Sequence, residues 1–130
     1  FPPRRSTDLS GVGHGGAVQG IGQALFELAA YEADTGQVLT GSLMDYALPR
    51  AGDIPSFEGA LTQDFPSHAN RLGVKGVGQA GAIASSGTIM NAVMNALAPL
   101  GVTHLDMPAT PERVWQMIRR ARGASADRSA

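Results

Sequence analysis

The sequence contains no cysteine among its 130 residues. Disulfide bonds and thiolate metal sites are therefore excluded, and a small secreted fold held together by disulfides is not expected. No apolar run approaches the roughly 20 residues that a membrane-spanning helix needs, and no signal-peptide core is visible at the N-terminus. These absences lead us to expect a cytoplasmic protein with no membrane span.

An excess of one charge is also missing, since 10 basic and 11 acidic side chains give a net charge of −1. The pattern shows no basic stripe of the kind that binds nucleic acid. The three histidines, His14, His68 and His104, stand far apart and lack metal-ligand spacing, so we interpret them as structural and predict no metal site formed by side chains. Asp45 and Asp53 lie in turn-like contexts, where their carboxylates are expected to accept local hydrogen bonds.

Glycine is abundant, and two glycine-rich segments each precede a predicted helix. Residues 11–16 lead into a helix expected over Ala17–Glu32, and residues 73–78 lead into one expected over Ala80–Leu97. Residues 98–101, with Pro99 and Gly101, are expected to end the second helix. A third helix is expected to begin at Pro111, with Thr110 as its N-cap. A glycine-rich loop before a helix points N–H groups outward, so Gln79 is placed to touch a ligand.

Between the helices, short alternating segments predict extended structure. We expect strands over residues 37–41, 56–62 and 102–106, and an extended segment over residues 42–49. The predicted fold is therefore α+β, with three helices packed on a small mixed or antiparallel sheet. Residues 11–121 are expected to form this unit. Residues 1–10 are expected to be disordered or a fragment edge, and residues 122–130 a flexible tail.

Four motifs, taken together, resemble one known family. In chain order they are HGGAVQGIGQAL (14–25), GSLMDYALPR (41–50), GVKGVGQAGAI (73–83) and LDMPATPERVW (105–115). In this order and spacing they resemble the C-terminal part of the molybdopterin-binding large subunit of the xanthine dehydrogenase/aldehyde oxidase family, especially its carbon-monoxide-dehydrogenase-like branch. The resemblance runs from about Gly11 to Ala121. It implies that the predicted unit is a subdomain of a larger molybdenum-cofactor-binding domain.

The resemblance also implies chemistry. The family hydroxylates aldehydes, purines and related carbon centres, or oxidises carbon monoxide, with molybdopterin or its cytosine dinucleotide. The cofactor's dithiolene holds the metal, so a chain without cysteine is compatible with the family. Partners implied for this chain are the remainder of the large subunit together with iron-sulfur and flavin subunits. The residues implied to bind the cofactor are Gly15, Gly16, Gln19 and Gly78.

Two positions depart from the family pattern. Gln79 stands where the family has the glutamate that serves as catalytic base, and a neutral amide cannot usefully accept a proton near pH 7. Loss of such a base typically costs ~10²–10⁴-fold in rate. Val12 stands where the family usually has a glutamine. A ligand contact and a cap of its own helix remain alternatives for Gln79, as do a pterin contact and a solvated helix face for Gln19.

Two hypotheses follow. In the first, the chain is a fragment or truncated member of a molybdenum hydroxylase large subunit, supplies one wall of the cofactor pocket, and is inactive and cofactor-free in isolation. In the second, it is a noncatalytic scaffold module that self-associates, as a homo-oligomer, to cover apolar surface. Gln79 and Val12, which both depart from the family pattern, favour the second hypothesis.

Overall fold

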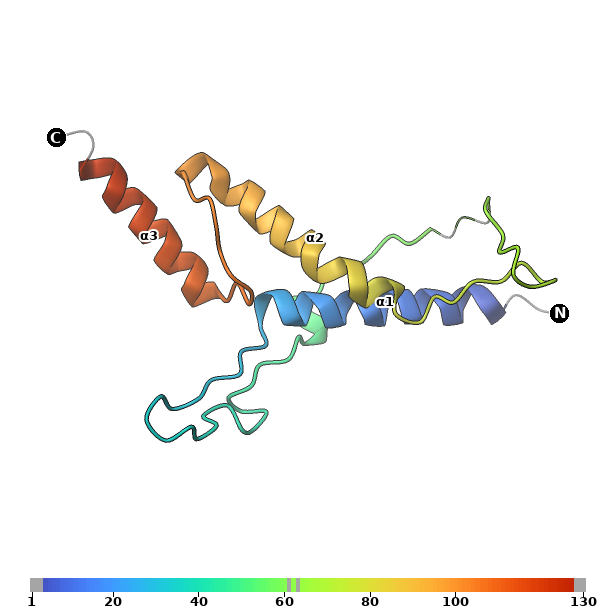
Figure 1. The fold of residues 1–130 in the computed structure, drawn as a ribbon, viewed down its shortest axis with the longest axis horizontal. Helices are drawn as coiled ribbons and strands as arrows, with labels where there is room; N and C mark the ends of the chain where they lie inside the picture. The colour runs from blue at the N-terminus through green and yellow to red at the C-terminus, as the bar shows by residue number, and fades with distance from the viewer. Residues whose placement is uncertain (1–3, 61, 63, 128–130) are drawn as a thin grey trace.

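A computed structural model describes residues 4–60, 62 and 64–127 of the chain. Its three α-helices are α1 (Arg4–Leu25), α2 (Ala80–Leu97) and α3 (Pro111–Asp127), and its two short 3₁₀ helices are η1 (Ala51–Asp53) and η2 (Ala98–Leu100). Helix α2 begins against the middle of α1, and the two helices then diverge (Figure 1). Within the described ranges, no helix is both long and apolar enough to cross a membrane.

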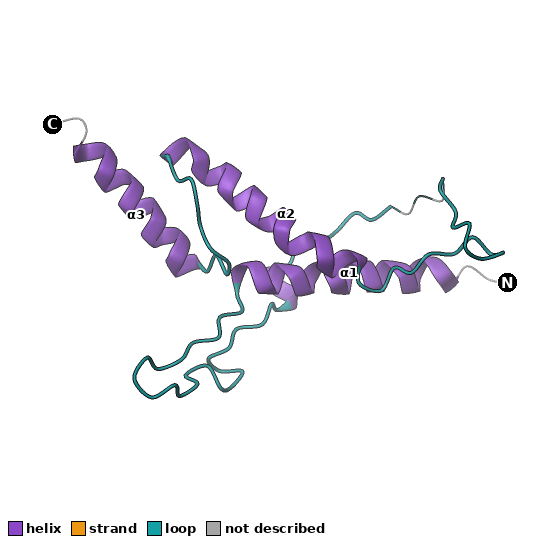
Figure 2. Cartoon of the chain, in the orientation of Figure 1, coloured by secondary structure: helices purple, strands orange, loops and turns teal. Residues whose placement is uncertain are grey.

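The predicted α+β fold is wrong, because helices and loops account for the described part of the chain without any sheet (Figure 2). Strands expected over residues 37–41, 56–62 and 102–106 are absent from the described residues; of these, residue 61 lies outside them. The nearest approach to a sheet is a single antiparallel bridge between Tyr31 and Val38. Alternation predicts a half-buried segment, but a strand also needs a neighbouring strand to pair with, and none of these segments has one.

Both ends of the first helix differ from the prediction of Ala17–Glu32. Helix α1 begins at Arg4, so it passes through the glycine-rich segment predicted as a loop. It ends at Leu25, where the amides of Phe26 and Glu27 both donate to the Gly22 carbonyl oxygen at 2.9 Å. Helix α3 continues to Asp127, so the tail expected from residue 122 is helical as far as that residue. Residues 1–3 and 128–130 lie outside the described residues.

The predictions for the other helix ends are confirmed. Helix α2 has the predicted bounds, and Gly101, with φ 79°, lies in the left-handed region that follows many helices. Helix α3 begins at Pro111, and the Thr110 hydroxyl accepts a hydrogen bond from the Arg113 amide at 3.4 Å. These ends depend on Pro, Gly and Thr acting over a few residues, which is why local sequence predicts them.

The core is small. Among the described side chains, the buried hydrophobic residues are Ala24, Leu97, Val102 and Ala109. The segment before α3 is fastened to the end of α1 by a hydrogen bond of 2.6 Å from the Ala109 amide to the Ala24 carbonyl oxygen. On α2, Leu97 is the one buried residue, and Ile83 is 78% exposed. Much apolar surface is therefore open to a further partner or chain segment.

Candidate functional site

A close contact between the backbones of α1 and α2 positions the candidate site. A Cβ atom added to Gly16 would lie 3.0 Å from the Ala82 nitrogen and 3.1 Å from the Gly81 Cα. A Cβ atom added to Gly81 would lie 2.7 Å from the Gly13 carbonyl oxygen and 2.9 Å from the Ala17 nitrogen. Glycine at both positions lets the two backbones touch. This contact holds the N-terminus of α2 against residues 13–17 of α1.

One turn further on, the same two helices meet at Gly20. A Cβ atom on Gly20 would collide with the Ser85 hydroxyl oxygen and would lie 2.9 Å from the Ser86 nitrogen. The Ser85 hydroxyl is buried in this contact and has no hydrogen-bond partner among the described residues. Gly16 and Gly20 therefore both serve helix packing, and the small residues at positions 13, 16, 17, 20 and 24 share this face of α1.

Gln79 is the residue that immediately precedes α2. Its backbone occupies the N-cap position, with φ −102° and ψ −1°, and its carbonyl oxygen accepts a hydrogen bond from the Ile83 amide at 3.0 Å. Its side chain is exposed and makes no capping hydrogen bond. Of the two alternatives for Gln79, the side-chain cap is therefore not observed. The amide is left available to a group brought from outside this segment.

Gly78, the predicted cofactor contact beside Gln79, is exposed, and a Cβ atom added there would meet nothing within 4 Å. The preceding loop is held by Asn70, whose side-chain carbonyl oxygen accepts from the Val74 amide at 3.1 Å and whose side-chain nitrogen donates to the Val74 carbonyl oxygen at 3.0 Å. Gly73 lies at φ 65°, and a Cβ atom added there would lie 2.9 Å from the Pro66 Cβ. The glycine-rich loop is thus fixed at its beginning and open at Gly78.

The predicted contacts on α1 divide between two faces. Gly16 faces α2, whereas Gly15 has nothing within 4 Å of an added Cβ atom and is exposed. Gln19 is exposed as well. At 100° per residue, Gly15 and Gln19 lie on one stripe with Val12 and Gln23, which are also exposed. The position where the family usually has glutamine, Val12, thus lies on the same open stripe as Gln19.

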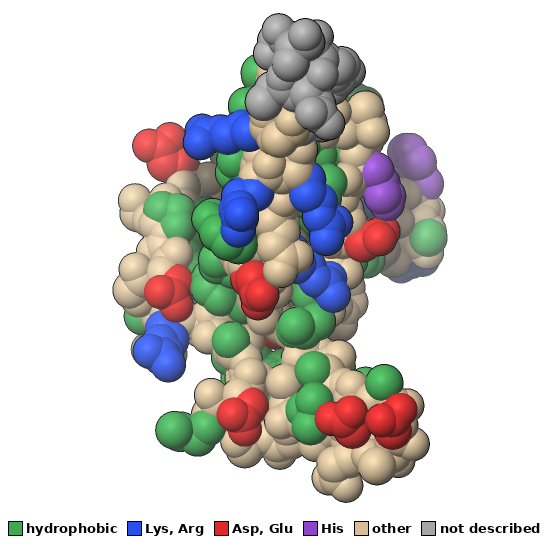
Figure 3. Space-filling view, turned by 90° about the vertical axis from the view of Figure 1, so that its left-hand side faces the viewer, with side chains coloured by type: hydrophobic (Ala, Val, Ile, Leu, Met, Phe, Trp, Pro, Cys, Tyr) green, Lys and Arg blue, Asp and Glu red, His purple; other side chains and the backbone are tan. Residues whose placement is uncertain are grey.

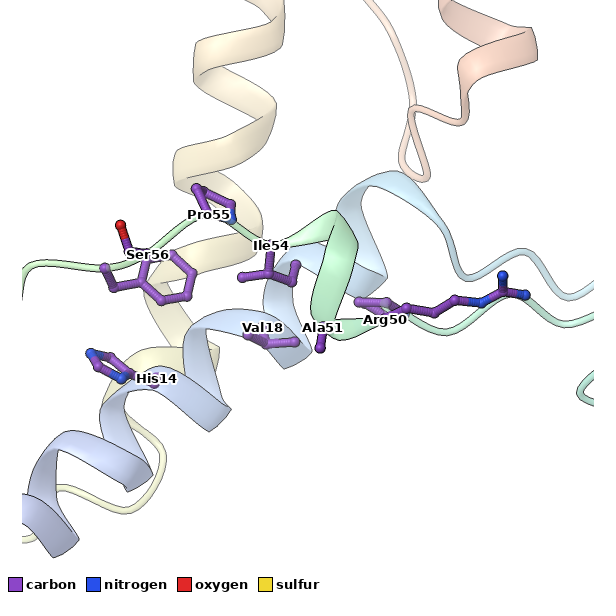
Figure 4. Close-up of a pocket in the computed structure, with 9 residues that line it drawn as sticks. His14, Val18, Arg50, Ala51, Ile54, Pro55 and Ser56 are labelled. Atoms are coloured by element: carbon purple, nitrogen blue, oxygen red, sulfur yellow. The ribbon is translucent and has the colours of Figure 1, made fainter.

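A pocket that sequence reasoning missed lies on a third face of α1. Its volume is about 460 Å³, and His14 and Val18 of α1 face Ile54 and Ser56 of the following loop across it (Figure 4). The His14 ring packs on Phe57 with ring centroids 5.5 Å apart. The remaining lining residues are Pro49, Arg50, Ala51 and Pro55. The lining is mostly apolar, and no local motif signals it because the contact joins segments about 40 residues apart.

The loop that follows α1 is fastened by polar contacts. The Tyr46 hydroxyl donates to a Glu27 carboxylate oxygen at 2.8 Å, and this hydrogen bond, with partial burial and the negative charge of Glu27, raises the pKa of Tyr46. Asp45 accepts from the Ser42 hydroxyl at 2.8 Å. Asp53 accepts from the Arg50 amide at 2.9 Å. The predicted turn roles of Asp45 and Asp53 are therefore confirmed.

Known proteins share both the sequence and the arrangement of this segment. The sequence pattern of the molybdopterin cofactor-binding domain matches residues 9–55. The gamma subunit of the 6-hydroxypseudooxynicotine dehydrogenase complex of Paenarthrobacter nicotinovorans is 45% identical over 101 residues, which are 78% of this chain and 12% of that protein. The carbon monoxide dehydrogenase large chain of Hydrogenophaga pseudoflava is 39% identical over 111 residues, which are 85% of this chain and 14% of that one.

A solved structure agrees with these similarities. The quinoline 2-oxidoreductase of Pseudomonas putida 86 superposes with a TM-score of 0.78 and 37% identity, covering 85% of this chain and 14% of its own. The chain therefore spans about one-seventh of the length of the proteins it matches. Over that short segment, it belongs to the molybdopterin-binding large subunits of the xanthine dehydrogenase/aldehyde oxidase family.

Proposed function

We propose that this segment forms one wall of a molybdopterin pocket in a molybdenum hydroxylase large subunit, and that the 130-residue chain has no turnover in isolation. The observation that carries the proposal is the open end of α2. The contact between Gly16 and Gly81 fixes that end against α1, while Gly78 and the Gln79 side chain stay exposed. A wall of this kind needs other segments to enclose a ligand.

The exposed residues of this segment fit a cofactor that is held between them and other segments of the large subunit. Gly15 and Gly78 have open space where a side chain would stand, so a large planar group has room to approach the backbone there. Gln19 and Gln79 each offer an amide that both donates and accepts hydrogen bonds. When bound, the molybdenum cofactor supplies the two-electron oxidation of the substrate carbon, and these four residues orient it.

Gln79 has the right place for a ligand contact and the wrong chemistry for a base. Its amide can hold a substrate or cofactor oxygen by hydrogen bonding, but it cannot take a proton from it near pH 7. We therefore propose that a large subunit with glutamine at this position retains the cofactor and turns over ~10²–10⁴-fold more slowly than one with glutamate.

The relatives indicate the kind of assembly to which this segment belongs. One of them is a subunit of a dehydrogenase complex, and another is the large chain of carbon monoxide dehydrogenase. We propose that iron-sulfur and flavin subunits accept the electrons and that the assembly is cytoplasmic. The substrate side of the pocket is formed by segments other than this one.

The test places residues 11–121 in the matching segment of the Hydrogenophaga carbon monoxide dehydrogenase large chain. With Gln79 retained, we expect normal molybdenum content, measured by elemental analysis, and a large loss of turnover. Gln79→Glu should restore turnover, whereas the matched change Gln23→Glu on the exposed stripe of α1 should not.

Two results would count against the proposal. If the chimera that retains Gln79 is already as fast as the chimera carrying Gln79→Glu, the base does not act from this position. If the isolated 130-residue chain holds molybdenum stoichiometrically and oxidises an aldehyde, the segment is more than a wall.

A further inference from the structure

A second cleft in this chain lies between α3 and the segment that precedes it. That segment runs from the end of α2 to the start of α3 (Figure 1), and its residues 104–106 form one wall of the cleft, whose volume is about 370 Å³. The α3 wall consists of side chains that follow one another at helical spacing, so they share one stripe of the helix. They are Arg113, Gln116, Met117 and Arg120.

Two guanidinium groups give the α3 wall its charge. The Arg113 side chain is partly buried, and its Nη1 atom donates to the Pro108 carbonyl oxygen at 3.1 Å, which fixes it beside the connecting segment. Arg120 is exposed about two turns further along α3. Within the described ranges, neither arginine has a carboxylate within ion-pair distance. A guanidinium has five N–H donors, so both groups retain donors for an oxyanion.

The opposite wall limits the charge that the cleft can accept. The Nε2 atom of His104 lies 2.9 Å from the Oδ1 atom of Asp106. Viewed from the side of α3, a His side chain and an acidic side chain lie to the right of the helix, next to Lys and Arg side chains (Figure 3). With histidine counted as neutral, the aspartate offsets one of the two arginines. A monoanion would neutralise the remaining charge, whereas a dianion would leave excess negative charge beside Asp106.

The cleft also offers apolar contact and has the size of a small-molecule site. Leu105 on one wall and Met117 on the other are partly buried, and the methionine thioether is well suited to an aromatic ring. The volume lies at the lower end of the range for small-molecule pockets. Glu112 accepts a hydrogen bond from the Gln116 side chain at 3.1 Å, so a second acid stands next to the lining. The two acids disfavour a polypeptide segment that carries several acidic groups.

We propose that this cleft binds a small organic acid that has one carboxylate and an apolar or aromatic body. The carboxylate accepts hydrogen bonds from Arg113 and Arg120, and the body lies on Leu105 and Met117. A free acid is the occupant that matches both the volume of the cleft and its single unbalanced positive charge. This inference does not depend on the cofactor role proposed above.

The first test titrates the full 130-residue chain with benzoate and follows the backbone amides by nuclear magnetic resonance. We expect saturable shifts at residues 104–106 and 113–120, while Val18 and Gly81 stay unchanged. Benzamide has the same shape without the charge, and acetate has the charge without the ring. Each should bind about tenfold more weakly than benzoate, because each loses one of the two kinds of contact.

The second test changes the charge of the lining. Arg120→Gln should weaken benzoate binding by about fivefold, the scale of one exposed ion pair. Arg122→Gln is the matched control, because Arg122 is exposed on the opposite side of α3 and lies outside the lining. Asp106→Asn should tighten binding by about threefold by removing a repulsive charge, whereas Asp34→Asn, in the exposed loop after α1, should leave it unchanged.

Four results would overturn the proposal. They are the absence of saturable shifts with benzoate at tens of millimolar, equally tight binding of benzamide, an equal loss in Arg122→Gln and Arg120→Gln, and tighter binding of a capped peptide with one glutamate between two leucines. The last result would assign the cleft to an acidic polypeptide segment instead. Circular dichroism on every variant separates lost binding from lost folding.

Discussion

Because the backbones of α1 and α2 touch, two Gly→Ala substitutions in α2 are expected to change the free energy of unfolding in opposite directions. At Gly81, a new Cβ atom would lie 2.7 Å from the Gly13 carbonyl oxygen and 2.9 Å from the Ala17 nitrogen, both of which are backbone atoms. At Gly87, also in α2 and exposed, a new Cβ atom would meet nothing within 4 Å. The two substitutions therefore add the same methyl group to a closed place and an open one.

The magnitudes follow from two competing effects. Replacing glycine by alanine inside a helix stabilises it by roughly 0.5–1 kcal/mol. Overpacking a close contact costs about 1–3 kcal/mol, and at Gly81 the obstructing atoms belong to the backbone of a neighbouring helix, which cannot move aside as a flexible side chain can. We expect Gly87→Ala to raise the free energy of unfolding by about 0.5–1 kcal/mol, and Gly81→Ala to lower it by about 1–2 kcal/mol.

Urea unfolding, followed by far-ultraviolet circular dichroism, measures both changes against the unaltered chain. The slope with denaturant should stay constant, so that a shift in the midpoint reports stability. If Gly81→Ala proves as stabilising as Gly87→Ala, then the two helices do not touch at this point in solution. In that case the placement of Gly78 and Gln79 beside α1 would also lose its support.

Two further predictions concern single polar groups. The hydrogen bond to Glu27 raises the pKa of Tyr46 above its usual value of about 10. The stability that this hydrogen bond contributes is therefore present below about pH 10, and it is lost as the pH rises through the folded-state pKa. In a Tyr31→Phe background, phenolate absorbance should therefore titrate at lower pH after Glu27→Gln, and an unchanged titration would exclude the contact. Ser85→Ala removes a buried hydroxyl without a partner and should raise the free energy of unfolding by about 1 kcal/mol. Ser86→Ala, measured in parallel, reports the part due to helix propensity, and equal gains at both positions would contradict the prediction.

Local sequence signals predict the parts of the fold that depend on neighbouring residues. The bounds of α2 follow from the glycine loop before it and from Pro99 and Gly101 after it, and the start of α3 follows from Thr110 and Pro111. The turn roles of Asp45 and Asp53 are local in the same sense, because each carboxylate accepts a hydrogen bond from a group three residues away.

The errors arise where distant residues decide the outcome. Glycines 13, 15 and 16 predict a loop when read alone, but Gly81 packs against Gly13 and Gly16 from about 65 residues away, and the backbone there is continuous helix. The sheet was predicted from alternation, which cannot show whether a partner strand exists. The pocket beside His14 likewise requires the loop at residues 49–57 to return to α1.

The family resemblance predicts the candidate site residues, and the structure divides them into residues that are exposed and one that packs against another helix. Gly15, Gln19, Gly78 and Gln79 remain open to a ligand, whereas Gly16 is occupied by packing against α2.

The meeting of Gly16 and Gly81 has a mechanical consequence for residue 79. Where side chains separate two helices, a change of rotamer can absorb a shift of one helix before the other moves. Here main-chain atoms abut, so their van der Waals radii alone set the spacing, and a tilt of α1 passes directly to the first turn of α2. The side chain at position 79 can therefore be exchanged, as between glutamine and glutamate, while the point in space from which it projects stays the same.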